Sequence, residues 1–265
     1  MKFYIITDLE GVGGVALPIQ TEAGNPMYEQ ARRLLTREVN IAVETLRELG
    51  AEEILVSDGH GANQAYNFVY EELTEGAKYM MGSPWTNYLP MLASDFSGLL
   101  IIGTHAMAGT KGAVLDHTMS SKSWRSAYLN DVQVGEIGIG AFYAGALDVP
   151  LIFVSGDDKA CLEAKGLVDE VEVAITKYGL TRTSAIMLPP DVVEKNLREG
   201  IKRAVEKCEH IKPLKLDPPV SFKIEFLLAE HTQRYWGKED VMLPDSRTVI
   251  FSGNDAREAI ERWYR

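Results

Sequence analysis

The sequence predicts an α/β protein with a mostly parallel sheet covered by helices, a hairpin excursion and a smaller C-terminal α+β portion. Two observations carry this prediction. Strand-like runs alternate with helical patterns through the first part of the chain, and those runs are continuously apolar rather than alternating with polar residues. Parallel strands covered by helices on both faces have this pattern, because both of their faces are buried.

Local signals predict the elements of the first part in order. Residues 2–7 form an apolar strand that ends at Asp8, and Asn25 caps a helix that has Pro26 in its first turn and ends at Gly50. The next expected elements are a strand at 53–56, a helix at 64–73, a strand at 78–81, a helix at 84–92, a strand at 98–103, a hairpin at 124–134 that turns at Asn130-Asp131, a helix at 136–147 and a strand at 151–155.

The second part of the chain is less regular. Asp191 and Glu194 predict a capping box, and apolar residues at helical spacing then predict a long helix. Strands at 220–228 and 248–252 and a helix from about Asn254 complete the expected elements. We predict an α/β core at 1–165 and a C-terminal α+β portion at 166–265, although no linker marks the boundary and a single domain is an open alternative.

Composition excludes several classes of protein. The chain has 265 residues, 46% of them hydrophobic and 25% charged, which is the balance of a globular protein and not of a disordered chain. A net charge of −11 repels phosphate backbones and anionic lipid, so neither nucleic acid nor a membrane is an expected partner. The two cysteines form no Cys-x-x-Cys motif, and the start of the chain does not resemble a signal peptide. We therefore expect a cytoplasmic protein.

Chemically useful side chains follow the ends of the predicted strands. Asp8 and Glu10 follow the first strand, His60 follows the second, and His105 follows the strand that ends at Gly103. Open parallel sheets bind ligands at this edge, so these side chains are expected to converge there. Glu136 starts the helix after the hairpin. Imidazoles with carboxylates suit zinc, and also iron, manganese or cobalt.

Five candidate ligands are too many for one catalytic zinc, which takes about three protein ligands. If Asp8 bridges, the five residues supply three contacts to each of two ions. His117, in a glycine-rich loop, is then left as an acid/base or as a stabiliser of an oxyanion. For Asp58 we favour a position behind His60, which it would orient, over metal ligation or a turn cap.

Plainer interpretations exist for the same residues. An aspartate that follows a strand commonly caps a helix or a turn, as Asp157 and Asp158 are expected to do. If all these polar residues only cap, the protein is a binding module without catalysis. If they bind metal, the same ligands also suit hydrolysis of another small amide or of a phosphoester, because fold and metal do not fix the substrate.

Five motifs in order resemble the zinc-dependent, self-compartmentalising D-aminopeptidases linked to bacterial dipeptide transport. They are Asp8-Leu9-Glu10-Gly11, Asp58-Gly59-His60, Gly103-Thr104-His105-Ala106, His117-Thr118-Met119 and Val134-Gly135-Glu136. The sequence departs from the family at Ile6, where the family tends to have serine.

The resemblance has specific implications. It implies two zinc ions per subunit, held by the residues Asp8, Glu10, His60, His105 and Glu136, with His117 as the catalytic residue. It implies hydrolysis of an N-terminal D-residue from a short peptide. It also implies a large ring-shaped homo-oligomer, such as a decamer, that encloses the active sites.

Overall fold

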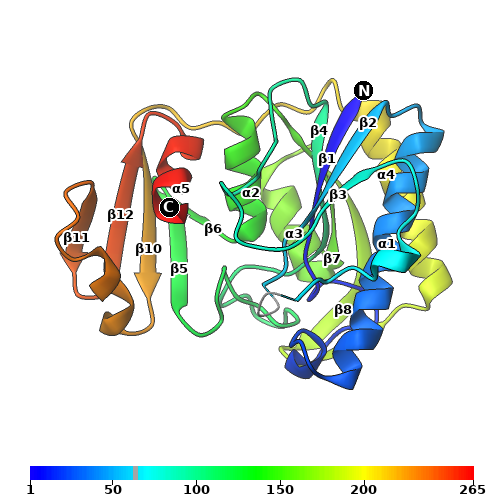
Figure 1. Cartoon of the computed structure of the whole chain (residues 1–265), viewed down its shortest axis with the longest axis horizontal. Coiled ribbons are helices and arrows are strands. Elements are labelled where there is room, and N and C mark those ends of the chain that lie inside the picture. Colours follow the sequence, from blue (N-terminus) through cyan, green and yellow to red (C-terminus); the bar gives the residue numbers. More distant parts are fainter. Residues whose placement is uncertain (62–64) are drawn as a thin grey trace.

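Two sheets organise the molecule, shown in Figure 1 as a computed structural model that describes residues 1–61 and 65–265. The seven-stranded sheet has the order β3-β2-β1-β4-β7-β8-β9, and the five-stranded sheet has the order β11-β12-β10-β5-β6. The large sheet consists of β1 (Lys2–Thr7), β2 (Glu53–Asp58), β3 (Lys78–Met80), β4 (Gly98–Thr104), β7 (Leu151–Asp157), β8 (Glu172–Thr181) and β9 (Ser184–Met187). The small sheet consists of β5 (Trp124–Leu129), β6 (Val132–Val134), β10 (Val220–Phe226), β11 (Val241–Asp245) and β12 (Thr248–Gly253).

Helices cover both faces of the large sheet. The α-helices are α1 (Pro26–Glu48), α2 (Glu136–Gly145), α3 (Asp158–Leu167), α4 (Pro190–Lys207) and α5 (Ala256–Tyr264), and the 3-10 helices are η1 (Pro18–Gln20), η2 (Tyr70–Glu72) and η3 (Ala229–Tyr235). Helices α1 and α4 pack together on one face, and α2 and α3 pack on the other (Figure 1). The central strands β4 and β7 are buried along their whole length. All strand pairs of this sheet are parallel except β8–β9, which confirms the predicted fold class.

The small sheet is antiparallel and packs against the C-terminal helix. Every second residue of β10 is buried, so this strand turns one face to a core. Trp263 of α5 fills that core together with Trp124 and Phe222, with ring centroids 5.1 and 5.8 Å from its own. Helix α5 also contacts α2, and the chain therefore ends between the two sheets (Figure 1).

Several predicted elements are confirmed, together with the signals that predicted them. Asn25 accepts a hydrogen bond from the backbone N–H of Met27 at the start of α1, and that helix ends just before Gly50. The hairpin of β5 and β6 turns at Asn130, which has a positive φ of 49°. Both cysteines are free and buried. No helix in the described part of the chain has the length and apolar character needed to cross a membrane.

Two predicted helices are wrong. Of the helix expected at 64–73, residue 64 lies outside the described residues, and residues 65–73 form only the short η2. The segment 84–92 is irregular, although Tyr88, Leu89 and Leu92 are buried at the spacing that suggested a helix. Pro90 lies inside this segment, where it lacks the N–H of a helical hydrogen bond and clashes with the preceding turn.

The predicted capping box is also wrong. Helix α4 begins two residues earlier than a cap at Asp191 requires, with Pro189 as its N-cap and no side-chain capping bond. Glu194 instead pairs with Arg37 and Arg198. Helix α3 and strands β8, β9 and β11 were not predicted from the sequence. The division at residue 165 stays a prediction, because β8, β9 and α4 extend the large sheet beyond it while β5 and β6 join the small sheet before it.

The small residues of α2 allow close packing inside the subunit. A side chain at Gly145 would collide with the backbone carbonyl of Leu214, in the connection from α4 to β10. A side chain at Gly140 would lie 3.5 Å from Ile101, an ordinary contact. The two glycines of one helix thus differ in what they permit.

We expect Gly145→Ala to lower the free energy of unfolding by about 3 kcal/mol, because the added methyl group overpacks a rigid backbone contact. The matched control is Gly140→Ala, which should change stability by less than about 1 kcal/mol, since alanine also favours the helix. Thermal or denaturant unfolding of both variants measures the difference. Equal stability of the two variants would contradict the packing described for Gly145.

Candidate metal centre

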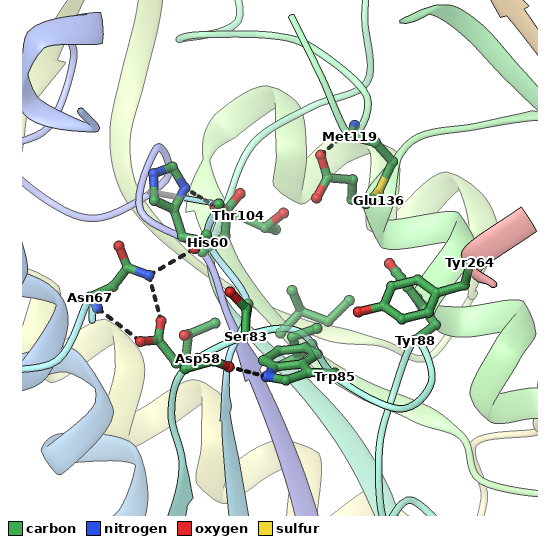
Figure 2. Close-up of a pocket in the computed structure, with 18 of the residues that line it drawn as sticks. Asp58, His60, Asn67, Ser83, Trp85, Tyr88, Thr104, Met119, Glu136 and Tyr264 are labelled. Carbon is green, nitrogen blue, oxygen red and sulfur yellow. Dashed lines mark hydrogen bonds and ion pairs between the residues drawn. The ribbon is translucent and has the colours of Figure 1, made fainter. Parts of the chain in front are cut away.

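The predicted site residues converge at the carboxyl edge of the large sheet. Asp8 and Glu10 follow β1, His60 follows β2, and His105 follows β4, and these three strands are neighbours in the order β2-β1-β4. Glu136 is the first residue of α2. Figure 2 shows His60 and Glu136 facing the same cavity from opposite sides.

Two groups of ligand-type atoms form, each with its atoms within 4.8 Å of one another. In the first, His60 Nδ1 lies 2.9 Å from Asp8 Oδ1 and 3.2 Å from Glu10 Oε2. In the second, Glu136 Oε1 lies 3.2 Å from His105 Nε2 and 3.8 Å from His117 Nε2. Asp8 belongs to the first group but also reaches the second, because its Oδ2 lies 3.2 Å from His105 Nε2.

Each of the three imidazoles is held by a backbone carbonyl. His60 Nε2 lies 2.9 Å from the carbonyl oxygen of Thr21, His105 Nδ1 lies 3.0 Å from that of Ala106, and His117 Nδ1 lies 2.8 Å from that of Leu115. A carbonyl oxygen only accepts, so these nitrogens carry the hydrogen in the neutral ring, and the other nitrogen turns a lone pair toward the carboxylates. Histidines that ligate metals show this arrangement.

Some buried polar atoms of the centre lack a hydrogen-bond partner. Within residues 1–61 and 65–265 they include Asp8 Oδ2, Glu10 Oε2 and His105 Nε2. An unsatisfied buried polar atom costs about 1–3 kcal/mol, and more when it is charged. Histidine nitrogens and carboxylate oxygens that face one another at 2.9–3.2 Å can share a proton, and the same atoms fit divalent cations such as zinc.

Electrostatics also favour a cation. Burial and the charge of Glu10 raise the pKa of Asp8 to about 7. Burial alone would raise the pKa of Glu136 as well, but His105 and His117 lower it to about 2. Burial and the neighbouring His105 lower the pKa of His117, which favours its neutral ring. The centre thus concentrates three carboxyl groups, and positive charge placed among them would stabilise their ionised forms.

Asp58, the last residue of β2, is hydrogen-bonded to Asn67 in the segment that follows this strand. Its two carboxylate oxygens accept hydrogen bonds from the backbone N–H and the side-chain amide of Asn67, at 2.8 and 2.7 Å. The same amide donates to the backbone carbonyl of His60 at 2.8 Å (Figure 2). Asp58 therefore fixes the backbone that carries His60, while Thr21 holds the imidazole ring. The sequence analysis did not single out Asn67.

The loop after β1, which carries Glu10, is in close backbone contact with the loop after β4, which carries His105. The N–H of Gly11 donates to the carbonyl of Gly103 at 2.7 Å. A side chain at Gly11 would collide with the backbone of Thr104. These glycines belong to the motifs around Glu10 and His105, so their small size explains how the two loops approach each other.

Lys177 stabilises the loop that follows β1 and carries Glu10. It is fully buried on β8, and its ammonium group donates to the carbonyls of Glu10 and Val12 at 2.6 and 2.7 Å. Burial lowers its pKa to about 8. Sequence reasoning missed this residue, because no local pattern reveals that a lysine from β8 reaches the loop after β1.

Two acidic residues position the loop that carries His105 and His117. Glu163 accepts a hydrogen bond from the N–H of Met107 at 2.7 Å. Asp157, expected to cap a helix or a turn, caps α3 with one carboxylate oxygen, and the other oxygen accepts from the N–H of Val114 at 2.7 Å. The ring of His117 stacks on that of His105, with centroids 3.8 Å apart. This loop is therefore fixed at both ends of the segment between the two histidines.

A cavity of about 210 Å³ opens beside the centre. Metal-ligand candidates form one wall, and Trp85, Tyr88 and Tyr264 form another (Figure 2). Trp85 and Tyr88 lie in the segment that was wrongly predicted as a helix, and Tyr264 lies at the end of α5. The N–H of Met119, which also lines the cavity, donates to Glu136 Oε1 at 2.7 Å.

A buried centre of histidines and carboxylates that opens on a cavity is typical of metal-dependent hydrolases. Residues 1–264 match the model of the Peptidase_M55 family, described as D-aminopeptidase, and the chain belongs to this family. It is 32% identical to a D-aminopeptidase of Bacillus subtilis (strain 168) over 269 residues, covering 98% of this chain and 94% of that protein.

A solved structure is also closely similar. It is the Zn-dependent D-aminopeptidase DppA from Bacillus subtilis, a self-compartmentalizing protease. It matches with a TM-score of 0.93 and 30% sequence identity, over 99% of this chain and 95% of that chain. These similarities confirm the family that the five sequence motifs resemble.

Proposed function

We propose that this protein is a zinc-dependent aminopeptidase that removes the N-terminal residue, in the D-configuration, from short peptides. The observation that carries the proposal is the set of converging imidazoles and carboxylates with unpartnered lone pairs beside a cavity, in a chain of the D-aminopeptidase family. The similar DppA structure is described as Zn-dependent. In the described part of the chain, the cavity lining includes no lysine or arginine, so the phosphoester alternative is not favoured.

We assign two ions per subunit to this centre. Asp8, Glu10 and His60 would hold one ion, and Asp8, His105 and Glu136 would hold the other. Asp8 is assigned as the bridge because its two oxygens face different histidines, Oδ1 toward His60 and Oδ2 toward His105. When bound, zinc polarises a carbonyl oxygen and makes water a nucleophile near neutral pH.

His117 is assigned as the acid/base. Its Nδ1–H is engaged with the carbonyl of Leu115, which leaves Nε2 to accept a proton from the attacking water and to donate it to the leaving amine. The stacking on His105 holds the ring in this orientation. His117 also lies in the second group of ligand-type atoms, so ligation is the competing role that an experiment must separate.

Assembly is part of the proposal. We propose a ring-shaped homo-oligomer such as a decamer that acts on short peptides, because the similar DppA is a self-compartmentalizing protease. The proposed location is the cytoplasm, as the sequence suggested. The exposed apolar side chains of the β8–β9 hairpin, Tyr178, Leu180, Ile186 and Met187, are suited to burial between subunits. Enclosed active sites would admit only small substrates.

The proposal predicts cleavage selectivity. With zinc-reconstituted protein, dipeptides with an N-terminal D-residue should be hydrolysed faster than their L-counterparts, and rates should fall as the peptide grows. Liquid chromatography of a matched D- and L-peptide series, from dipeptides to decapeptides, measures both trends. Cleavage of a phosphoester without cleavage of any peptide would refute the proposed activity, and efficient cleavage of a folded protein would refute the enclosed assembly.

Asp8→Ala should lose both zinc ions, since the variant removes the proposed bridge. Elemental analysis after dialysis gives the metal content per chain. Asp95→Ala is the matched control, because Asp95 is an exposed carboxylate paired with Lys2, and it should keep full metal content. If Asp8→Ala retained both ions, the bridging assignment would be untenable.

His117→Ala should keep its zinc and its fold but lose turnover by about 10²–10⁴-fold, the usual contribution of a positioned acid/base. Metal analysis and the dipeptide assay are run on the same samples. His210→Ala, at an exposed position, should retain activity. Loss of zinc together with activity in His117→Ala would make His117 a ligand instead.

A further inference from the structure

A second cavity of about 440 Å³ lies next to the first. Met119 lines both cavities, and its N–H is bonded to the Glu136 carboxylate of the metal centre. The last helix also separates them, because Trp263 lines the second cavity and the adjacent Tyr264 lines the first. Met119, which is bonded to the metal centre, therefore lies at the junction of the two cavities.

The second cavity contains a cation suited to an anionic group. Arg234, on η3, donates to the hydroxyl of Tyr235 and lies 4.6 Å from the centroid of that ring. Within residues 1–61 and 65–265, its guanidinium group forms no ion pair with a carboxylate. The planar guanidinium group can bind a carboxylate with two parallel hydrogen bonds, and the contact with Tyr235 restricts its orientation.

Other polar groups of this cavity complement Arg234. His231 Nε2 is buried and lacks a hydrogen-bond partner among the described residues. Ser120 and Ser123 line the same cavity. Glu230 also lines it, and its like charge opposes an anion there. The cavity thus offers hydrogen-bond donors to one carboxylate, while the charge of Glu230 disfavours a ligand that carries more than one negative charge.

We propose that the second cavity is the subsite for the free α-carboxylate of a short peptide, with Arg234 as its main contact. The inference rests on the proposed function, and it places the N-terminal residue in the first cavity and the scissile bond beside Met119. The residues after the scissile bond then extend past Met119 toward η3. The metal centre performs the reaction, while Arg234 selects peptides whose C-terminus is close behind the scissile bond.

The selection has a chemical signature. A peptide amide has the same shape as the free acid but lacks the charge, so it loses the charge-assisted hydrogen bonds. A longer peptide moves its carboxylate away from Arg234. Short peptides with a free carboxylate are therefore favoured by each subunit, in addition to any exclusion by an assembled ring.

The test compares D-alanylglycine with D-alanylglycinamide on the zinc-loaded wild type and on Arg234→Gln. The wild type should have a KM about 10-fold or more lower for the acid, because hydrogen bonds to charged groups contribute strongly. Arg234→Gln should raise KM for the acid only, leave kcat nearly unchanged and abolish the preference. Glu230→Gln should lower KM for the acid. Arg247→Gln is the matched control and should behave as the wild type. Arg247 is an exposed arginine between β11 and β12, and it lines a different cavity.

Calorimetry of D-alanylglycine binding to the metal-free protein gives a readout that does not depend on activity. Arg234→Gln should weaken this binding by about 10-fold, and Arg247→Gln should not change it. Equal KM for acid and amide in the wild type, or equal losses for both in Arg234→Gln, would overturn the subsite. If the wild type cleaved neither peptide, the proposed function would fail, and calorimetry would still decide whether Arg234 binds the carboxylate.

Discussion

Three carboxyl groups lie in one small centre, where Asp8 and Glu10 are buried and Glu136 is half-buried, and the surrounding elements are arranged around them. Asp8, Glu10 and Glu136 face histidine nitrogens at 2.9–3.2 Å, and buried atoms among them lack partners. Such an arrangement is costly unless a proton or a cation lies between the groups. The surrounding architecture keeps these groups together, and the family to which the chain belongs is consistent with a metal as the compensating charge.

Backbone contacts supply the rigidity that this centre requires. The carbonyls of Thr21, Ala106 and Leu115 orient the imidazole rings. Lys177 and Asn67 hold the backbones of the loops that carry the ligands. Because the ligand side chains come from separate strands, small shifts of these loops would change their mutual distances. Residues without a direct role in chemistry therefore fix the geometry on which the chemistry depends.

The second sheet connects this centre to substrate selection. Helix α5 packs on β10 and β12 and ends at Tyr264, which forms part of the first cavity wall (Figure 1). Helix η3, from the same half of the chain, contributes Arg234 to the second cavity. The large sheet thus carries the ligand-type residues, and the small sheet with its helices shapes the space in front of them. The same metal centre could accept other substrates if these elements changed.

The parallel sheet and the candidate ligands could be predicted without coordinates, because strand ends and apolar runs are local patterns in the sequence. Asp8, His60 and His105 follow strands that lie side by side, so their convergence could be inferred from topology rules alone. The irregular course of residues 84–92, which lets Trp85 and Tyr88 line the first cavity, depends on tertiary packing and was not predicted. The packing of distant segments also brings Lys177 to the loop after β1 and places Arg234 in a cavity that Met119 lines as well. These contacts join residues far apart in the chain, and their energies depend on burial and distance, which no local pattern encodes.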